Sequence, residues 1–423
     1  MQVRIGTGAT TPFNLGALQA AFRHHADGSG VFESGQHPII VGQAAYNQTY
    51  GTSFAAAGWC SSPTSTNKCD GYARISQQGT DPFTFDTLRG AKLSIPFQPK
   101  AIHDEMNATS FDEYGRMQAN LGVEAVPATP GLQNVNLFPY VMPPTELIDT
   151  TDLPRTSHVT PIAVASDGTQ IWKITHNGVD THPIHFHAFD VQVLNRVTWD
   201  NIVMPPDPNE LGWKDTVRVS PLEDTIVALR PIIPVLPWEL PNSVRLLDPS
   251  RPDGAVMTSA TIADPLGLPI LASPTGEPID VSNHLVNFGG EYVYHCHILS
   301  HEEMDMMRPV LLAYPPLAAT PAYDGAAIAW TDASVAETAY AVEQWVDGAW
   351  VEVWRTNRDL ASPNDTGELL SYAGPFVSGE RYRVVAENTV GDTWNYADPG
   401  LNEIVSGGFP TVTARSTAEL TIP

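Results

Sequence analysis

Residues 291–306 read EYVYHCHILSHEEMDM, and the first part of this stretch decides the fold prediction. The run EYVYHCHIL has the composition of a β-strand, in which successive side chains point to opposite faces of a sheet. Cys296 then points to one face, while His295 and His297 point together to the other. This alternation predicts two metal sites joined through two peptide units, so that electrons could pass from the sulfur to either histidine within one strand.

The face that carries Cys296 predicts a blue-copper site. Such a site needs two histidines, one cysteine and a weak axial methionine in a trigonal arrangement. His301 and Met306 follow Cys296 on the loop that leaves the strand, and both can fold back onto the metal. The second histidine must come from elsewhere in the chain, and His182 is the candidate.

The opposite face predicts a second metal cluster. Residues 182–187 read HPIHFH, so His185 and His187 share one face of an expected strand. They can meet His295 and His297, which gives a cluster of four imidazoles. The alternatives are a surface histidine pair, a cysteine that is only a core side chain and a structural zinc site. Copper is favoured because a zinc site does not call for an axial methionine or for two histidine pairs around one cysteine.

Three segments resemble the multicopper oxidase family. HPIHFH (182–187) and HCHILSHEEMDMMRP (295–309) are similar to its two C-terminal copper motifs, and the second motif resembles the bacterial spore-coat laccases. GWKDTVRVSPLEDTIVALRP (212–231) is similar to the strand pair between these motifs. NATSFDEYGRMQANLG (107–122) and the C-terminal module resemble the large bacterial members that contain several cupredoxin domains. The specific resemblance covers about residues 155–315.

The resemblance implies a role for each candidate residue. It gives the type 1 copper two histidines, the cysteine and the axial methionine, which are His182, His301, Cys296 and Met306. It gives the type 2 copper His185, and it gives the type 3 pair His187, His295 and His297. Substrate would lose single electrons at the type 1 copper through the edge of His301, and Cys296 would pass them to the trinuclear cluster, where dioxygen becomes water. Glu302 matches a carboxylate that helps to deliver protons to that reduction; the alternative is a solvated loop acid.

We predict an all-β chain in four parts. Short β-rich runs bounded by Asp-Gly, Asn-Gly, Pro-Pro and Gly-Gly predict a cupredoxin-like Greek-key β-sandwich over residues 151–316. Residues 317–412 alternate with period two and resemble a fibronectin type III domain with a role in spacing or adhesion. Residues 1–150 are predicted to be a loop-rich, partial or irregular cupredoxin-related region that ends in a proline-rich connector. Residues 413–423 are predicted to be a tail.

Composition excludes several partners. The 423 residues carry a formal net charge of −25, which would repel nucleic acid and anionic membranes and would concentrate metal cations. No apolar run approaches the ~18 residues that a membrane span needs. Cys60 and Cys69 bracket a short polar loop, and they are either a disulfide or two free thiols.

The histidine set departs from the family pattern. The family takes half of its cluster histidines from two His-x-His motifs near the N-terminus, whereas both His-x-His pairs of this chain lie in the C-terminal set. The remaining histidines are predicted to be ordinary surface or loop residues: His24, His25, His37, His103, His158, His176 and His284. The chain also begins without a secretory leader. We therefore expect the C-terminal portion of a longer oxidase that is secreted, periplasmic or at the cell surface, with the missing ligands upstream or on a partner chain.

Two functions remain open from the sequence. The first is a laccase-like multicopper oxidase that uses dioxygen and a small reductant such as a phenol, an aromatic amine or Mn²⁺, and that is inactive if this chain is isolated. The second is an electron-transfer or copper-binding cupredoxin without turnover of its own. The set of His185, His187, His295 and His297 favours the oxidase. The absence of the two further His-x-His motifs favours the electron-transfer protein. A copper nitrite reductase is disfavoured because that family lacks a histidine directly after the cysteine, here His297.

Overall fold

A computed structural model describes fourteen stretches of the chain, and the structural statements below concern these residues alone. They are residues 14–21, 82–86, 92–104, 119–125, 134–138, 140–153, 167–199, 203–204, 206–210, 214–258, 274, 279–357, 365–395 and 409–423. The predictions for Cys60, Cys69, His24, His25, His37 and His158 lie outside the described residues. Within these ranges, no helix has the length and apolar character needed to cross a membrane. In the part of the chain that the structure describes, the helices are short: α1 at Leu15–Ala21, α4 at Leu299–Glu302 and the 3₁₀ helix η3 at Pro208–Glu210.

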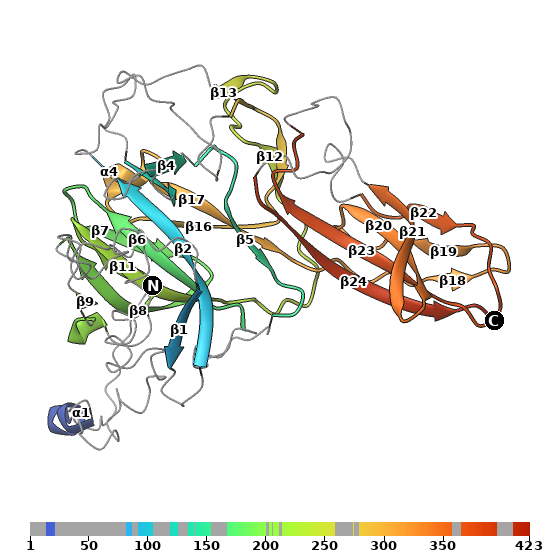
Figure 1. Ribbon diagram of the computed structural model, residues 1–423, viewed down its shortest axis with the longest axis horizontal. Helices are drawn as coiled ribbons and strands as arrows, with labels where there is room; N and C mark the ends of the chain where they lie inside the picture. Colours follow the sequence, from blue (N-terminus) through green and yellow to red (C-terminus); the bar gives the residue numbers. More distant parts are fainter. Residues whose placement is uncertain are drawn as a thin grey trace, which may run out of the picture.

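The first large sheet forms one layer of the N-terminal lobe (Figure 1). Its strands run in the order β4-β3-β2-β6-β11-β8-β9, and β1 pairs with β2. The bounds are β1 Pro82–Asp86, β2 Lys92–His103, β3 Asn120–Ala125, β4 Asn134–Phe138, β6 Gln170–His176, β8 Phe189–Thr198, β9 Val203–Met204 and β11 Glu223–Pro231. Strands β6, β8 and β11 are almost wholly buried, including polar side chains such as Lys173, Gln192 and Arg196.

The second sheet carries the histidine segments. Its order is β10-β7-β16-β17-β5, with bounds β5 Glu146–Asp149, β7 His182–Phe186, β10 Thr216–Val219, β16 Gly290–Cys296 and β17 Met307–Ala313. Strand β7 is antiparallel to β16, with His185 opposite His295 and Ile184 opposite Cys296. The predicted strand around Cys296 is therefore confirmed, and the two distant histidine segments lie side by side.

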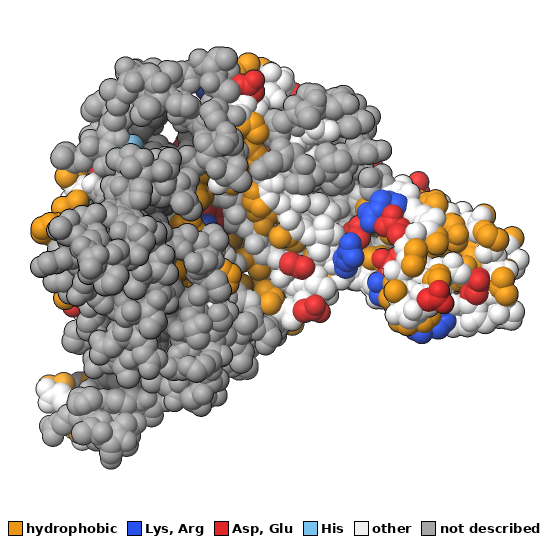
Figure 2. All heavy atoms as spheres, viewed as in Figure 1, with side chains coloured by type: hydrophobic (Ala, Val, Ile, Leu, Met, Phe, Trp, Pro, Cys, Tyr) orange, Lys and Arg blue, Asp and Glu red, His pale blue; other side chains and the backbone are white. Residues whose placement is uncertain are grey.

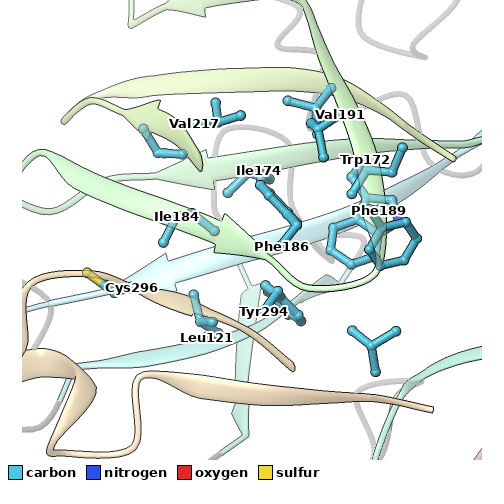
Figure 3. Close-up of a cluster of buried hydrophobic side chains, with 14 of the residues drawn as sticks. Leu121, Trp172, Ile174, Ile184, Phe186, Phe189, Val191, Val217, Tyr294 and Cys296 are labelled. Carbon is cyan, nitrogen blue, oxygen red and sulfur yellow. The ribbon is translucent and has the colours of Figure 1, made fainter. Parts of the chain in front are cut away.

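A shared apolar core joins these two sheets into a β-sandwich, consistent with the cupredoxin-like prediction. Trp172 lies at its centre and makes edge contacts with Phe186, Phe189 and Tyr294 at centroid distances of 5.1 to 5.9 Å (Figure 3). Burial of each such side chain contributes roughly 1.5–3 kcal/mol. Cys296 belongs to the same cluster, so the strand that carries it is anchored in the core.

The C-terminal lobe is a second β-sandwich. One sheet has the order β12-β15-β23-β20-β21 with β24 beside β23, and the facing sheet has the order β18-β19-β22. The bounds are β12 Val244–Leu246, β15 Leu285–Asn287, β18 Ala322–Tyr323, β19 Ile328–Thr331, β20 Ala339–Val346, β21 Ala349–Asn357, β22 Leu369–Tyr372, β23 Arg381–Gly391 and β24 Thr411–Thr421. The visible outer face mixes charged and hydrophobic side chains (Figure 2). The fibronectin type III assignment stays a prediction.

Two local expectations for this lobe can be compared with the structure. The hairpin at Asp347-Gly348 is confirmed: both residues have positive φ angles, 49° and 90°, and Val346 pairs with Ala349. The segment predicted as a tail differs, because most of it is strand β24, which pairs with β23 along its whole length. An edge strand has a weaker apolar pattern than a core strand. The pattern of residues 413–423 therefore does not indicate a strand.

Sheet pairing crosses both of the predicted boundaries between domains. Strand β2, upstream of residue 150, pairs in parallel with β6 downstream of it. Strand β15, upstream of residue 316, pairs with β23 in the C-terminal lobe. A second apolar cluster also includes residues of both lobes, such as Phe288 and Val390. The described strands on either side of each boundary are therefore packed together rather than joined by free linkers. A small fifth sheet among the described residues pairs β13 Val256–Thr258 with β14 Val281–Ser282.

Candidate metal centre

The ends of two strands and one helical turn bring three donor atoms together on the core side of β16. His182 begins β7, Cys296 ends β16, and His301 lies in α4. Their potential ligand atoms all lie within 4.8 Å of one another, and His182 Nδ1 is 3.3 Å from Cys296 Sγ. All three side chains are buried. The helical turn at His301 differs from the loop expected there.

The loop after Cys296 closes back onto the strand end and places Met306 there. The backbone N–H of Cys296 donates to the carbonyl of Met306 at 3.1 Å, and the N–H of Met306 donates to the carbonyl of His301 at 3.0 Å. Met306 is fully buried and belongs to the same apolar cluster as Cys296. Asp305 takes a positive φ of 64°, which turns the chain at this point. The thiol of Cys296 also accepts a hydrogen bond from the Ile298 N–H at 3.3 Å.

Four imidazoles gather on the opposite face of the sheet. His187 Nε2 is 3.3 Å from His295 Nε2, and the potential ligand atoms of His185, His295 and His297 lie within 4.8 Å of one another. The rings of His295 and His297 have a centroid distance of 4.6 Å. His185 Nδ1 contacts the carbonyl of Asp215 at 2.9 Å, and His295 Nδ1 contacts the carbonyl of Cys296 at 3.2 Å. Imidazoles that donate from Nδ1 to these carbonyls present the Nε2 lone pair to the cluster.

Glu302 lies against this cluster. One carboxylate oxygen is 3.7 Å from His295 Nδ1, and the other is 3.8 Å from His297 Nδ1. The side chain is 31 % exposed. The geometry gives the carboxylate contact with both the cluster and solvent, unlike the exposed neighbour Glu303.

Burial sets the protonation of the donors in the metal-free protein. Desolvation, helped by the nearby His176 and His301, lowers the pKa of His182 to about 4, and desolvation also lowers the pKa of His187 and of His295. Burial raises the pKa of the Cys296 thiol to about 11. At neutral pH the imidazoles of His182, His187 and His295 are therefore neutral, the form that binds metal, whereas the thiol must release its proton to a metal.

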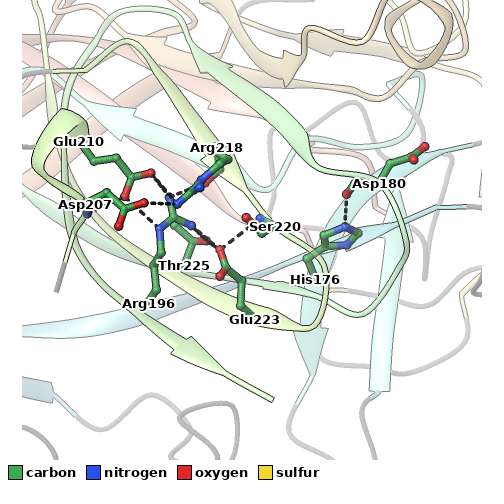
Figure 4. A network of polar contacts seen from close by, with 9 residues as sticks. All are labelled: His176, Asp180, Arg196, Asp207, Glu210, Arg218, Ser220, Glu223 and Thr225. Atoms are coloured by element: carbon green, nitrogen blue, oxygen red, sulfur yellow. Dashed lines mark hydrogen bonds and ion pairs between the residues drawn. The ribbon is translucent and has the colours of Figure 1, made fainter. Parts of the chain in front are cut away.

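Two residues that the sequence analysis did not single out lie behind His182. The carboxylate of Asp104 is 3.3 Å from His182 Nε2, and His176 packs its ring against that of His182 at a centroid distance of 4.8 Å. His176 points to the backbone carbonyl of Asp180 at 2.6 Å (Figure 4). The same figure shows Arg196 bridging Glu210 and Glu223, which ties neighbouring strands together.

The prediction that His176 and His284 are ordinary surface or loop residues is wrong for His176, which ends β6, and wrong about exposure for His284, which does lie in the link between β14 and β15. His176 is completely buried beside His182, and His284 is buried in a contact of 2.9 Å with Asp392 while it stacks on Trp394. His103 is partly buried. No local pattern distinguishes these histidines from exposed ones, because their partners lie far away in the sequence.

The donor chemistry fits copper. A buried thiol and two imidazoles around one point, with the buried Met306 on the adjoining loop, match the soft and borderline ligands of a blue-copper site. The four imidazoles on the other face suit copper as well, and carbonyl contacts hold the rings of His185 and His295 with Nε2 directed inward. A tetrahedral zinc site would use neither the methionine nor the second imidazole set.

Comparisons with known proteins agree on a class. Residues 129–236, which include His182, His185 and His187, match the family model described as multicopper oxidase. The family implies copper as the metal. The segment that contains Cys296 lies outside the matched residues.

Individual relatives are laccases. The chain is 26% identical over 160 residues to a laccase of Bacillus subtilis, covering 35% of this chain and 21% of the relative. It is 25% identical over 155 residues to a laccase of Haloferax volcanii, covering 37% of this chain and 17% of the relative. The chain thus spans about a fifth of the length of the curated relatives that it matches.

Solved multicopper oxidases give weaker superpositions. The enzyme from Aquifex aeolicus is 19% identical, with a TM-score of 0.23, over 51% of this chain and 29% of that chain. The enzyme from Campylobacter jejuni is 13% identical, with a TM-score of 0.25, over the same shares of the two chains. TM-scores this low do not establish a shared fold.

Proposed function

We propose that this chain is the part of a laccase-like multicopper oxidase that holds a complete type 1 copper site and half of the ligands of the trinuclear cluster. One observation carries the proposal: two donor sets lie back to back on β16, with Cys296 on one face and His295 on the other. The type 1 ligands are His182, Cys296, His301 and Met306. The type 2 ligand is His185, and the type 3 ligands are His187, His295 and His297.

Copper at these two donor sets would supply one-electron oxidation of a substrate and reduction of dioxygen to water. The chain's own residues connect the two donor sets and bring the type 1 site close to solvent. Cys296 is bonded through the backbone to its neighbours His295 and His297, so the path between the two faces needs no jump through space. His301 is buried, yet its Nε2 lies 3.8 Å from Asp180, whose side chain is 48 % exposed, so the imidazole is one side chain from solvent. Glu302 bridges the cluster to solvent and can hold a proton there.

The same proposal covers the reducing substrate, the missing cluster histidines and the cellular location. A phenol, an aromatic amine or a metal ion such as Mn²⁺ could each give single electrons to a type 1 site. We expect the missing cluster histidines on an upstream segment or on a partner chain, and a protein that works in a secreted, periplasmic or cell-surface setting. The C-terminal lobe keeps its fibronectin-like assignment as a proposal.

Copper loading tests the proposal. The chain loaded alone should bind about one copper with the intense blue absorption of a thiolate ligand. Addition of a segment that carries two His-x-His motifs should raise the copper content to about four and should produce oxygen consumption with a reductant. A chain that turns blue but consumes no oxygen under any such addition would be the electron-transfer alternative. A chain that binds no blue copper would contradict both functions.

A further inference from the structure

A buried carboxylate holds the type 1 histidine from behind. Asp104 directly follows β2, and β2 pairs in parallel with β6, so that Ile102 lies opposite His176 at the same end of the sheet. The Asp104 side chain is completely buried. One oxygen, Oδ2, is 2.9 Å from the Val179 N–H and 3.1 Å from the Asp180 N–H, which both donate to it. The same oxygen lies 3.3 Å from His182 Nε2.

The loop between β6 and β7 is shaped around this carboxylate. A Cβ atom at Gly178 would lie 1.7 Å from Asp104 Oδ1 and 2.0 Å from Cγ, so only glycine allows the loop to approach this closely. Residues 177–181 form the link between His176 and His182. Asp104 therefore fixes the course of the chain that enters β7 and the position of its first residue.

The two ring nitrogens of His182 face different partners. Nδ1 is 3.3 Å from Cys296 Sγ, and Nε2 faces Asp104. A carboxylate in this position accepts a hydrogen bond from Nε2–H, which leaves the lone pair on Nδ1. The carboxylate thus selects the tautomer in which Nδ1 can bind a metal beside the thiolate. A negative charge behind the ring also makes the imidazole a stronger donor.

The alternative is that Asp104, His176 and His182 bind a metal of their own, since their potential ligand atoms lie within 4.8 Å of one another. The hydrogen bonds of His176 argue against it. Its Nε2 lies 2.6 Å from the Asp180 carbonyl, and its Nδ1 accepts from the Gly178 N–H at 3.2 Å. His176 therefore has no lone pair directed to a cation, and it serves to hold the same loop.

We infer that Asp104 is a positioning residue of the metal centre, which orients His182 with Nε2 protonated and Nδ1 directed to Cys296, and that Gly178 makes room for it. This inference rests on the proposed function for its effect on copper. Its effect on the imidazole does not depend on copper at all.

The first measurement uses the metal-free full chain. Nitrogen-15 labelling of histidine and long-range proton–nitrogen correlation report which ring nitrogen of His182 carries the proton, and a His182→Gln variant assigns the signal. The wild type should show Nε2–H. Asp104→Asn, which keeps an acceptor oxygen, should retain this tautomer, whereas Asp104→Leu and Gly178→Ala should lose it. A wild-type Nδ1–H tautomer would overturn the inference even if the chain binds no copper.

The second measurement uses the copper-loaded chain. Asp104→Asn should keep the blue absorption and raise the reduction potential, because it removes a negative charge behind the ligand. Gly178→Ala should weaken copper binding by about 10–100-fold, the usual effect of losing a partner of a ligating histidine. If Asp104→Leu does not fold, Asp104→Asn and Gly178→Ala decide the outcome. Unchanged potential in Asp104→Asn together with unchanged affinity in Gly178→Ala would reject the inference.

A matched control is available in the same chain. Asp392 is a buried carboxylate 2.9 Å from His284 Nε2, a pair built like that of Asp104 and His182 but outside the candidate metal-ligand groups found among the described residues. Asp392→Asn makes the same chemical change and should leave the His182 tautomer and the copper potential as in the wild type. A shift as large as that of Asp104→Asn would show a general effect of lost buried charge, and it would reject a specific role for Asp104.

Discussion

The candidate ligands on the two faces of strand β16 differ in burial and in the contacts that surround them. On the core face, Cys296 meets His182 and His301 in full burial, and Asp104 holds His182 in turn. On the opposite face, the imidazole of His297 is 49 % exposed. Within the described ranges, its neighbours on that face are the other histidines and Glu302.

This difference indicates what each face needs from the rest of the protein. The core face is covered by the larger sheet of the same chain, so all its donors and their supporting contacts can be encoded here. On the opposite face the exposed imidazole of His297 is a position where a further polypeptide could add ligands. The proposed type 1 site therefore takes its ligands from this chain, whereas the proposed trinuclear cluster needs further ligands.

The largest effect should follow from removal of the thiol. Cys296→Ser should abolish the intense blue absorption completely, because the colour arises from charge transfer between thiolate and copper. Absorption spectra of the copper-loaded variant measure it, with the double variant Cys60→Ser and Cys69→Ser as the control for loss of other thiols. A blue Cys296→Ser protein would show that the core face is not the type 1 site.

Substitution on the opposite face should separate the two sites. In a protein completed by the missing histidine segment, His297→Asn should reduce copper binding by the imidazole cluster and abolish oxygen consumption, while the blue absorption stays at the wild-type level. Copper content and absorption of the same sample give both readings. A variant at the exposed neighbour Glu303, Glu303→Gln, serves as the control. Loss of the blue band in His297→Asn would mean that the two faces are not independent.

The sequence predicts which side chains share each face of β16, but not every residue that packs against them. Alternation along one strand assigns Cys296 and His295 to opposite sides, because the side-chain period of a strand is two. The Asp347-Gly348 turn is equally local. Asp104 lies 78 residues from His182, and only the parallel pairing of β2 with β6 brings them together. Pairing between distant strands depends on the whole fold, so no local sequence pattern indicates it.

The same limit applies to the division into parts. Composition suggested breaks near residues 150 and 316, since proline-rich connectors and changes of pattern are local signals. Strand pairing across both positions could not be read in this way. Burial of His176 and His284 escaped prediction for the same reason, because each is buried by partners from other strands.

Burial of the core face should make stability depend on pH in the metal-free protein. The pKa of His182 is about 4 when folded against 6.5 for the free side chain, so the unfolded chain binds more protons between these values. Stability should therefore be full above pH 6.5 and should fall towards pH 4, with roughly 3 kcal/mol from this residue. The pKa of Cys296, raised to about 11 from 9.0, predicts a second loss as the pH rises from 9 to 11.

Denaturant unfolding across this pH range measures both limbs of the profile. Cys296→Ser should lessen the alkaline loss, and His182→Gln should lessen the acid loss, since neither replacement side chain titrates there. His187 and His295 on the opposite face should add to the acid loss, because desolvation lowers their pKa values as well. A profile with no loss between pH 6.5 and pH 4 would contradict the buried, neutral state of the core histidines.

The smallest effect should come from the residue that completes the core face. Met306 is fully buried at the closure of the loop onto Cys296, so leucine can replace it with little change in volume. Met306→Leu should keep both the copper and the blue absorption but raise the reduction potential, because the weak axial donation of the thioether is lost. A redox titration followed at the blue band measures the shift, and Met304→Leu, at a half-buried position two residues earlier on the same loop, is the matched control. An unchanged potential in Met306→Leu would mean that the thioether is not an axial ligand, and the core face would then hold copper through three donors only.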